Sequence, residues 1–362
     1  MTGGISPTGV GYSLAATLTA NASKIHQQLS VLTEQASTGL IADTYAGLGN
    51  GAAVSLDLNP QLTALQTYKS NIDRASGSMQ VTQAAMTQLQ QIAAKFVADI
   101  PNLNGINSSE VDSVAANARA ALSQVADLLN TKNGNVYVFG GQDSANPPVP
   151  GSDAILSSGF YSQINAAVSG LAANGATATT AATLTIAGSN GSGTSPFSAY
   201  LSQPAASLSP PVVQTGDTTM VATGLLASGN STALSTGPST TGSYMRDLMR
   251  ALATLGSMSS TQLNDPGFNA LVSDTGASLN SAVTAMAVDV GVLGTTQANL
   301  TKTQTQLSDT TTALTGQLTN VQDADMAATL SKLTAMQTQL QESYRLITSA
   351  NSLSLINFLP AA

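Results

Sequence analysis

The chain has 362 residues, enough for two or three domains, and its composition is unusual. Charged residues make up 8%, with 11 Lys and Arg against 19 Asp and Glu, so the net charge is −8. Phosphate binding needs clustered cations, and the sequence therefore argues against a nucleic-acid partner. The chain has no cysteine and one histidine, which excludes disulfides, zinc–thiolate sites and sites built on a histidine pair.

An apolar stripe with helical spacing runs through the N-terminal segment. Its large members recur mostly at steps of three or four residues, and they are Leu14, Leu18, Ile25, Leu29 and Leu32. This pattern predicts a helix with one apolar face of the coiled-coil type. Gly39 follows the stripe and is a typical helix end, and the GLGNG run at 47–51 predicts a loop.

Two further helices are predicted before residue 135. Apolar residues from Leu58 to Phe96 alternate between steps of three and four, which indicates one long helix with Pro60 in its first turn. A third pattern runs from Val111 to Leu129 and predicts a helix that ends at 132–134, where the sequence is Lys-Asn-Gly.

The middle of the chain has a different character. Between Lys132 and Arg246 there is no Lys or Arg, and Gly, Ser, Thr, Ala and Pro are abundant. Short apolar runs at 136–139, 182–186 and 220–226 are typical of strands. We therefore expect a loop-rich β domain over residues 136–243 that faces solvent and decorates the helical part.

The strongest periodic signal lies in the C-terminal third. Seven apolar residues follow one another at intervals of seven: Leu279, Met286, Leu293, Leu300, Leu307, Leu314 and Val321. This repeat predicts a long helix with left-handed packing. After Asp323 and Asp325, which we interpret as helix-capping residues, a last stripe predicts a terminal helix through Met326, Leu330, Leu333, Leu340, Tyr344 and Ile347.

These patterns predict a mainly α fold with a β-rich insertion. Helices from both termini should form an elongated, antiparallel, coiled-coil-like bundle that carries the central β-rich, loop-rich domain. The expected segments are an N-terminal assembly helix (1–45), the N-terminal part of a helical rod (46–135), the central outer domain (136–243), the C-terminal part of the rod (244–320) and a C-terminal assembly helix (321–362).

Sites for chemistry are not evident in the sequence. No nucleophile motif or phosphate-binding glycine loop occurs, and His26 lies one step from the N-terminal stripe without a base partner nearby in sequence. We therefore expect no enzymatic activity, no cofactor and no metal site. No continuous apolar run approaches about 18 residues, so membrane insertion is not expected either.

Three stretches of the chain resemble a known family. They are LSVLTEQASTGL at 29–40, the C-terminal segment 321–359 with VQDADM and SLSLINFL, and YVFGGQDSANPP at 137–148. Together they resemble the flagellin superfamily, and most closely its hook–filament junction members of the hook-associated protein 3 type. The departures favour a junction protein: Asp43-Thr44-Tyr45 replaces the family's Asp-Asp pair, Thr329 replaces a common Glu, and the C-terminal Arg is absent.

The resemblance implies a structural subunit of the bacterial flagellum that joins hook and filament. It further implies extracellular assembly, type III export without a cleaved signal peptide, and three kinds of partner: copies of the chain, neighbouring hook-associated or flagellin subunits, and an export chaperone. The first 23 residues contain no Lys or Arg, which also argues against a secretory signal. Two alternatives stay open, a filament flagellin and a flagellin-like surface adhesin or glycan-binding protein.

The terminal stripes are the candidate assembly interface. Its residues are Leu14, Leu18, Ile25, Leu29, Leu32, Met326, Leu330, Leu333, Leu340, Tyr344 and Ile347. Ordering two long arms costs conformational entropy that so few large apolar side chains do not offset in a lone helical hairpin. We therefore expect the arms to be mobile in the monomer and ordered in an assembly.

Overall fold

A computed structural model describes residues 8–103, 108–229 and 232–356 of the chain, and the side chains of its first and last helices from residue 16 and up to residue 349. The chain divides into two compact units. The first consists of residues 1–66 and 309–362, and the second of residues 67–308. Helices α2 (Gly51–Asp99) and α7 (Phe268–Gln322) each contribute to both units.

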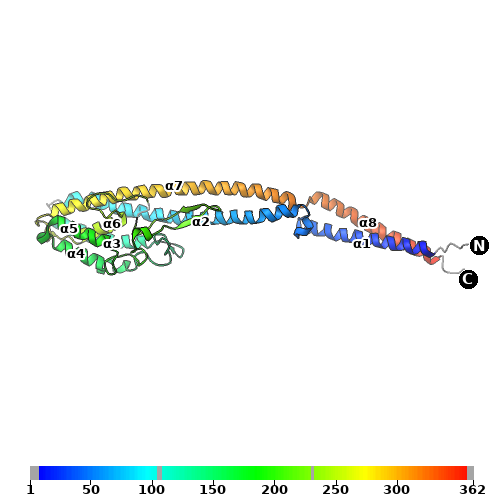
Figure 1. Cartoon of the computed structure of the whole chain (residues 1–362), viewed down its shortest axis with the longest axis horizontal. Helices are drawn as coiled ribbons and strands as arrows, with labels where there is room; N and C mark the ends of the chain where they lie inside the picture. Colours follow the sequence, from blue (N-terminus) through cyan, green and yellow to red (C-terminus); the bar gives the residue numbers. More distant parts are fainter. Residues whose placement is uncertain (1–7, 104–107, 230–231, 357–362) are drawn as a thin grey trace, which may run out of the picture. The chain divides into compact units, whose positions relative to one another are not determined.

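The first unit is built around two terminal helices. Helix α1 (Thr8–Thr38) and helix α8 (Met326–Ile356) lie side by side and run antiparallel (Figure 1). A short 3₁₀ turn (Tyr45–Leu48) leads from α1 to the start of α2. Helix α1 ends one residue before Gly39, whose φ of 76° lies in the left-handed region, so the expected helix end is confirmed.

The second unit combines the rest of α2 and α7 with four shorter helices. These are α3 (Ser108–Leu129), α4 (Gly159–Ser169), α5 (Leu171–Gly188) and α6 (Tyr244–Gly256). Helix α3 packs on α6, α4 on α5, and α5 on α6. Short 3₁₀ turns occur at Ile100–Leu103, Ser152–Ser157, Ala205–Ser207 and Ser260–Gln262.

Strands are few in the described part of the chain. Strand β1 (Lys132–Asn133) pairs antiparallel with β2 (Val136–Tyr137), and β3 (Val212–Gln214) with β4 (Met220–Ala222). The mainly α class is thus confirmed, and its β part is small. The run at 182–186, which we interpreted as strand-like, lies in helix α5.

Two helix boundaries differ from the sequence-based expectation. Helix α3 ends at Leu129, and Gly134-Asn135 instead forms the turn between β1 and β2, where Gly134 has a φ of 61°. Helix α2 begins at Gly51, so Pro60 lies inside the helix and not in its first turn. Proline has no N–H, so the carbonyl of Leu56 lacks its usual helical donor at that turn.

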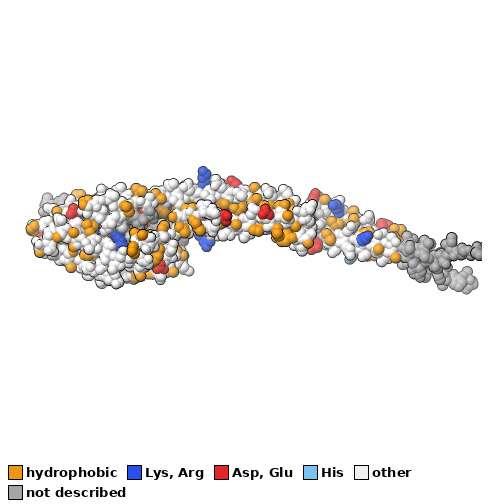
Figure 2. Space-filling view, viewed as in Figure 1, with side chains coloured by type: hydrophobic (Ala, Val, Ile, Leu, Met, Phe, Trp, Pro, Cys, Tyr) orange, Lys and Arg blue, Asp and Glu red, His pale blue; other side chains and the backbone are white. Residues whose placement is uncertain are grey.

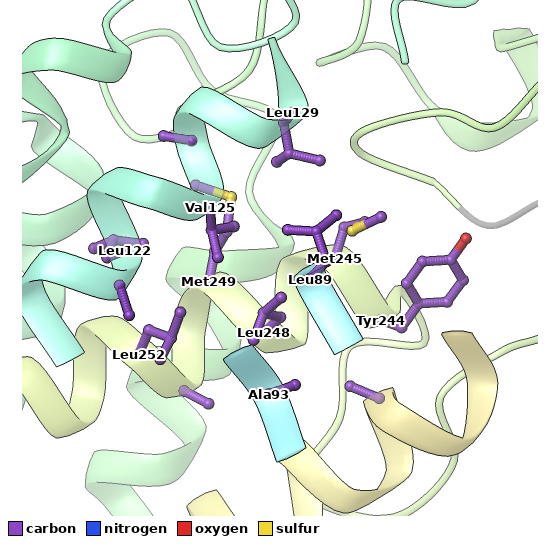
Figure 3. Packing of buried hydrophobic residues seen from close by; sticks show 14 of the residues in the cluster. Leu89, Ala93, Leu122, Val125, Leu129, Tyr244, Met245, Leu248, Met249 and Leu252 are labelled. Carbon is purple, nitrogen blue, oxygen red and sulfur yellow. The ribbon is translucent and has the colours of Figure 1, made fainter. Parts of the chain in front are cut away.

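The core of the second unit follows the predicted periodicity. Ile72, Met79, Met86, Leu89 and Phe96 of α2 are buried. The same holds for the first four members of the seven-residue repeat in α7: Leu279, Met286, Leu293 and Leu300. Figure 3 shows Leu89 and Ala93 of α2 beside apolar side chains of α6, which pack in turn with those of α3. The long helices are therefore fixed by apolar packing along their whole length in this unit.

Helix α6 is buried on all sides, including its charged residues. The guanidinium of Arg246 donates to the carbonyl oxygens of Ser228 (2.9 Å) and Ala187 (2.9 Å), and that of Arg250 donates to the carbonyl oxygen of Ser239 (2.6 Å). The central segment thus covers the polar face of α6 through hydrogen bonds. It is part of the packed core of this unit, and the expectation of a solvent-facing decoration is wrong for these residues.

Candidate assembly interface

The two terminal helices meet along one apolar seam. Besides Gln35, the buried and half-buried residues of α1 form a series at steps of four and three, and this series is Leu18, Ala22, Ile25, Leu29, Leu32 and Ala36. On α8, besides Ala328, the corresponding series is Thr329, Leu333, Met336, Leu340, Ser343 and Ile347. This alternation is the a/d pattern of a coiled coil, in which each helix buries one stripe of residues against the other helix.

The seam is only partly closed within one chain. Among the described side chains of α1 and α8, only Ala22 (6% exposed) and Thr329 (5%) are fully buried. The large apolar members are half-buried, in contrast to the core of the second unit, where comparable leucines are shielded from solvent completely. A helix pair with this burial recovers only part of the hydrophobic free energy that its side chains offer.

The structure brings most of the predicted interface residues to this seam. Leu18, Ile25, Leu29, Leu32, Leu333, Leu340 and Ile347 lie in it and are half-buried. Met326, Leu330 and Tyr344 are exposed at 38%, 51% and 54%. Leu330 and Tyr344 both follow a seam position of α8 by one residue, which is the flanking e position of the heptad. The side chain of Leu14 lies outside the described residues.

A groove runs along the opposite flank of the seam. It encloses about 400 Å³, and its lining consists of Gln27, Gln28, Val31, Leu32 and Gln35 from α1 with Lys332 and Met336 from α8. Val31 is 51% exposed there, although the sequence pattern did not include it. The amide groups of the glutamines can donate and accept hydrogen bonds, and Lys332 supplies the one positive charge of this lining.

Apolar side chains are therefore exposed on both flanks of the seam. Leu330 and Tyr344 lie on one flank, and Val31 and Leu346 (58% exposed) lie on the other by heptad position. Charged side chains are sparse on the face that Figure 2 shows, and hydrophobic side chains reach the surface among uncharged polar ones. Such flanks favour contacts with further helices on two sides of the pair.

The start of α8 is fixed by a local cap. The carboxylate oxygen Oδ1 of Asp325 accepts a hydrogen bond of 3.0 Å from the backbone N–H of Ala328, so its predicted role as a capping residue is confirmed. Asp323 lies in the connection between α7 and α8 and takes part in backbone pairing with Leu40. Neither carboxylate belongs to a metal-binding group, and among the described residues no cluster of three or more His, Cys, Asp or Glu side chains occurs.

Two remaining features bear on the functional classes considered above. His26 is exposed on α1. By length and composition, helix α7 contains a stretch that is long and apolar enough to cross a membrane, although the sequence has no unbroken apolar run of that length. In the structure, 39% of this stretch is buried. One such helix is weak evidence, because the core helix of a protein outside the membrane meets the same criterion.

Comparison with protein families agrees with this helical arrangement. The bacterial flagellin N-terminal helical region matches residues 11–144, and the bacterial flagellin C-terminal helical region matches residues 277–359. Together the two matches cover more than half of the chain. The chain belongs to the flagellin superfamily. Proteins of this family are structural components of the extracellular flagellum and self-assemble into its polymers, so this chain is a structural flagellar subunit and not an enzyme.

The two family matches cover the N-terminal and C-terminal parts of the chain and leave its middle unmatched. The N-terminal match spans α1 to α3 with the β1–β2 hairpin, and the C-terminal match spans most of α7 and all described residues of α8. Residues 145–276, which include α4, α5 and α6, lie between the two matches. No curated protein matches the chain in a direct sequence comparison.

Proposed function

We propose that this chain forms the junction between hook and filament, and that paired terminal helices of neighbouring subunits pack against one another there. The observation that carries the assembly part is the half-open seam of α1 and α8, with Val31, Leu330, Tyr344 and Leu346 more than half exposed. Packing against further helices removes this apolar surface from water and thereby orders the arms.

Two features of the sequence support the junction over the filament. The segment 137–148 resembles the corresponding segment of junction proteins, and it begins in strand β2. Thr329 replaces the Glu that is common in the family, and it is buried in the seam at 5% exposure. A carboxylate at this position would be desolvated, so the seam of this chain differs from that of a subunit with Glu there.

Export and delivery are part of the same proposal. The subunit leaves the cell through the flagellar type III apparatus without a cleaved signal, and an export chaperone shields the apolar flanks of the arms beforehand. The exposed apolar side chains of α8 support a need for such shielding, since patches of this kind promote association before the subunit reaches its place.

Copy number decides between junction and filament. We would measure the amount of this chain relative to hook protein in purified hook–filament preparations by quantitative mass spectrometry. A junction subunit is present in ring-sized numbers, well below hook protein, whereas a filament flagellin exceeds hook protein by far. Absence of the chain from these preparations would contradict both assignments.

The structure also determines how the adhesin alternative is best tested. Phe160, Ile164, Leu201 and Leu226 of the central segment are buried in the same core as α2, α3, α6 and α7. The segment 140–243 therefore lacks a core of its own, and polysaccharide binding has to be measured with the full chain. Saturable binding by the full chain, together with absence from flagellar preparations, would favour an adhesin.

A further inference from the structure

Large apolar side chains are exposed in two places on the second unit. Val212 and Met220 lie on the strand pair β3–β4, and Leu234, Val288 and Val292 lie on α7 and the loop beside it. Met220 and Leu234 are the most exposed of them, at 63% and 67%. The core of the same unit shields comparable side chains from solvent, so these two places are exceptions that indicate contact with a partner.

The strand pair has one apolar face turned to the core and another turned to solvent. Val213 and Val221 stand opposite each other and pack on the core. Because side chains alternate between the two faces of a strand, Val212, Met220 and Ala222 point the other way, and all three are exposed. We call these three residues the hairpin face.

The second exposed surface lies on α7. Val288 and Val292 are one helical turn apart and face the same side of the helix. Leu234 lies beside them, because the backbone N–H of its neighbour Ala233 donates to Oδ1 of Asp289 (3.0 Å). We call Leu234, Val288 and Val292 the α7 patch. Apart from the buried Asp289, residues 275–301 of α7 include no charged residue, so the helix around the patch is uncharged.

Within one chain the two surfaces lie at different levels of α7. Asn71 of α2 donates through Nδ2 to the carbonyl oxygen of Gln214 (3.1 Å), which fixes β3 at that point of α2. The antiparallel helices α2 and α7 are in register where Nζ of Lys69 donates to Oγ of Ser308 (3.3 Å), so Asn71 lies level with residue 306. Val292 is about 20 Å from that level, at 1.5 Å for each helical residue. The hairpin face is therefore free to contact a second copy.

The turn of the strand pair points towards the C-terminal end of α7. Residues close to the turn lie at Asn71, and after β4 the chain reaches Asp289, where the N–H groups of Thr232 (3.2 Å) and Ala233 donate to the carboxylate. Strand β4 thus runs from the level of residue 306 towards that of residue 289, and the turn lies at the opposite end (Figure 1). If a neighbouring copy has the same orientation and its hairpin lies on the α7 patch, that turn points towards Lys302.

The charges at the two surfaces are complementary. Asp217, in the exposed turn of the hairpin, is the only charged residue between 208 and 224. Lys302 is the first charged residue of α7 after Asp289, and it lies on the side of Val292, since steps of three and four lead from 292 through 295 and 299 to 302. Both side chains are exposed, and within the described part of the chain neither belongs to an ion pair. An anion on one surface thus matches a cation beside the other.

From these observations we propose that the hairpin face of one subunit packs on the α7 patch of a neighbouring copy of this chain, with Asp217 beside Lys302 of that copy. The contact rests on the proposed assembly and adds an interface on the second unit to that of the terminal helices. Two different surfaces meet, so the contact is heterologous and continues from subunit to subunit in one direction. Neighbours of the same orientation are then staggered by about 20 Å along α7.

The absence of cysteine from the sequence allows a direct test. Two full-length variants, Met220→Cys and Val292→Cys, are mixed, assembled alone or on hook preparations, and treated with a short thiol cross-linker. A product that joins positions 220 and 292 can form only between copies, and peptide mapping by mass spectrometry identifies it. The control mixture pairs Met220→Cys with Leu156→Cys, which changes an exposed apolar residue of the same unit outside both surfaces.

The 220–292 product should exceed the 220–156 product several-fold in the assembled protein. It should fall to the level of the control at concentrations too low for assembly. Equal yields of the two products in the assembled protein would overturn the contact.

Charge reversal tests the orientation of the hairpin. Asp217→Lys and Lys302→Asp should each lower the assembled fraction measured by sedimentation, because like charges then face each other across the contact. The chain with both substitutions should recover it, and circular dichroism of the monomers checks that the fold is unchanged. Absence of recovery in the double variant would overturn the placement of Asp217 beside Lys302.

Failure of the proposed function is distinguishable from failure of this contact. If the chain without substitutions does not assemble, either alone or on hook preparations, the proposed assembly is wrong and the contact falls with it. If that chain assembles and the 220–292 product stays at the level of the control, only the contact is wrong, because other surfaces then hold the subunits together.

Discussion

The hydroxyl of Tyr244 donates a 2.8 Å hydrogen bond to Oδ2 of Asp289, and both side chains are buried. This bond joins α6 to α7 at a point where Asp289 also accepts hydrogen bonds from the backbone N–H groups of Thr232 and Ala233. One carboxylate thereby ties a helix of the C-terminal flagellin region to α6 and to a loop of the central segment. Burial and the neighbouring Asp289 together raise the pKa of Tyr244, so its hydroxyl stays protonated as a donor.

Tyr244→Phe should therefore destabilise the second unit with little change in shape. Hydrogen bonds to charged groups contribute about 1.5–3 kcal/mol, and the variant leaves a buried carboxylate oxygen without this donor. We expect a loss of that size in the free energy of unfolding from urea denaturation. Tyr45→Phe, at a position that is 47% exposed, is the matched control and should leave the free energy nearly unchanged. If Tyr244→Phe lowered the free energy of unfolding by less than the experimental error, the role of this bond would be contradicted.

The burial of Asp247 predicts a specific pH dependence of the free energy of unfolding. Burial raises the pKa of its carboxyl group above the ordinary 3.8, against the opposing effects of hydrogen bonds from Ser235 and Thr241 and of the nearby Arg250. A carboxyl whose pKa is higher in the folded than in the unfolded chain binds more protons in the folded state between the two values. Its contribution to stability therefore falls as pH rises through this interval.

Comparison with Asp247→Asn isolates this effect. As pH rises from about 4 towards neutral, the unfolding free energy of the variant should increase relative to that of the unsubstituted chain. Asp112→Asn is a control of opposite sign: hydrogen bonding from Ser260 lowers the pKa of Asp112, so its stabilising contribution is present above the ordinary pKa and is lost as pH falls through the folded value. Chemical denaturation at several pH values measures both. Parallel curves for all three proteins would refute the prediction.

The unpaired hydroxyl of Thr254 offers a route to higher stability. Its side chain is fully buried in α6, and Oγ1 has no hydrogen-bond partner among the described residues. Thr254→Val replaces the hydroxyl by a methyl group of similar size, and we expect a gain of about 1 kcal/mol in the free energy of unfolding. Thermal unfolding followed by circular dichroism measures the change.

A matched threonine supplies the control for that gain. Thr275 in α7 is equally buried, but its Oγ1 donates to the carbonyl oxygen of Leu271 (2.7 Å). Thr275→Val should therefore lower stability by about 1 kcal/mol, because a satisfied hydrogen bond is lost. A loss of stability in both variants would show that the hydroxyl of Thr254 has a partner, and a gain in both would contradict the contribution of the Thr275 hydrogen bond.

The sequence allowed prediction of the long helices because their burial is periodic. The seven-residue repeat of α7 and the stripe of α2 place apolar residues on one face, and a single face decides both the element and its packing. The same reasoning located most of the α1–α8 seam, including Leu29 and Leu333. It missed Val31, whose exposure beside the groove depends on where α8 lies and not on a repeat.

The central segment was predicted poorly for a different physical reason. Residues 182–186 have the composition of a strand, but they lie in α5. There the hydroxyl of Thr183 accepts a hydrogen bond from Nη1 of Arg250 (3.2 Å). This partner is far away in sequence. Buried charges such as Arg246 and Arg250 look like surface residues in any periodic analysis, because only the tertiary hydrogen bonds make their burial acceptable.

Leu340→Asp tests the terminal seam directly. Leu340 is half-buried between α1 and α8, and a carboxylate at this seam position would be desolvated when further helices pack against the pair. We expect loss of assembly, by sedimentation and electron microscopy, with export intact, as shown by normal amounts of the chain in the culture medium. Because the arms contribute little to the core of the second unit, the unfolding transition of that unit should stay unchanged.

Thr338→Asp is the matched control for added charge on the same helix. Thr338 is exposed and lies two residues before Leu340, which places it on the opposite side of α8. Its variant should retain more assembly than Leu340→Asp by a wide margin. Normal assembly of Leu340→Asp would refute packing through this seam. Equal loss in both variants would show that added charge on any side of α8 prevents assembly, and the interface would then have to surround the whole helix and not follow the stripe.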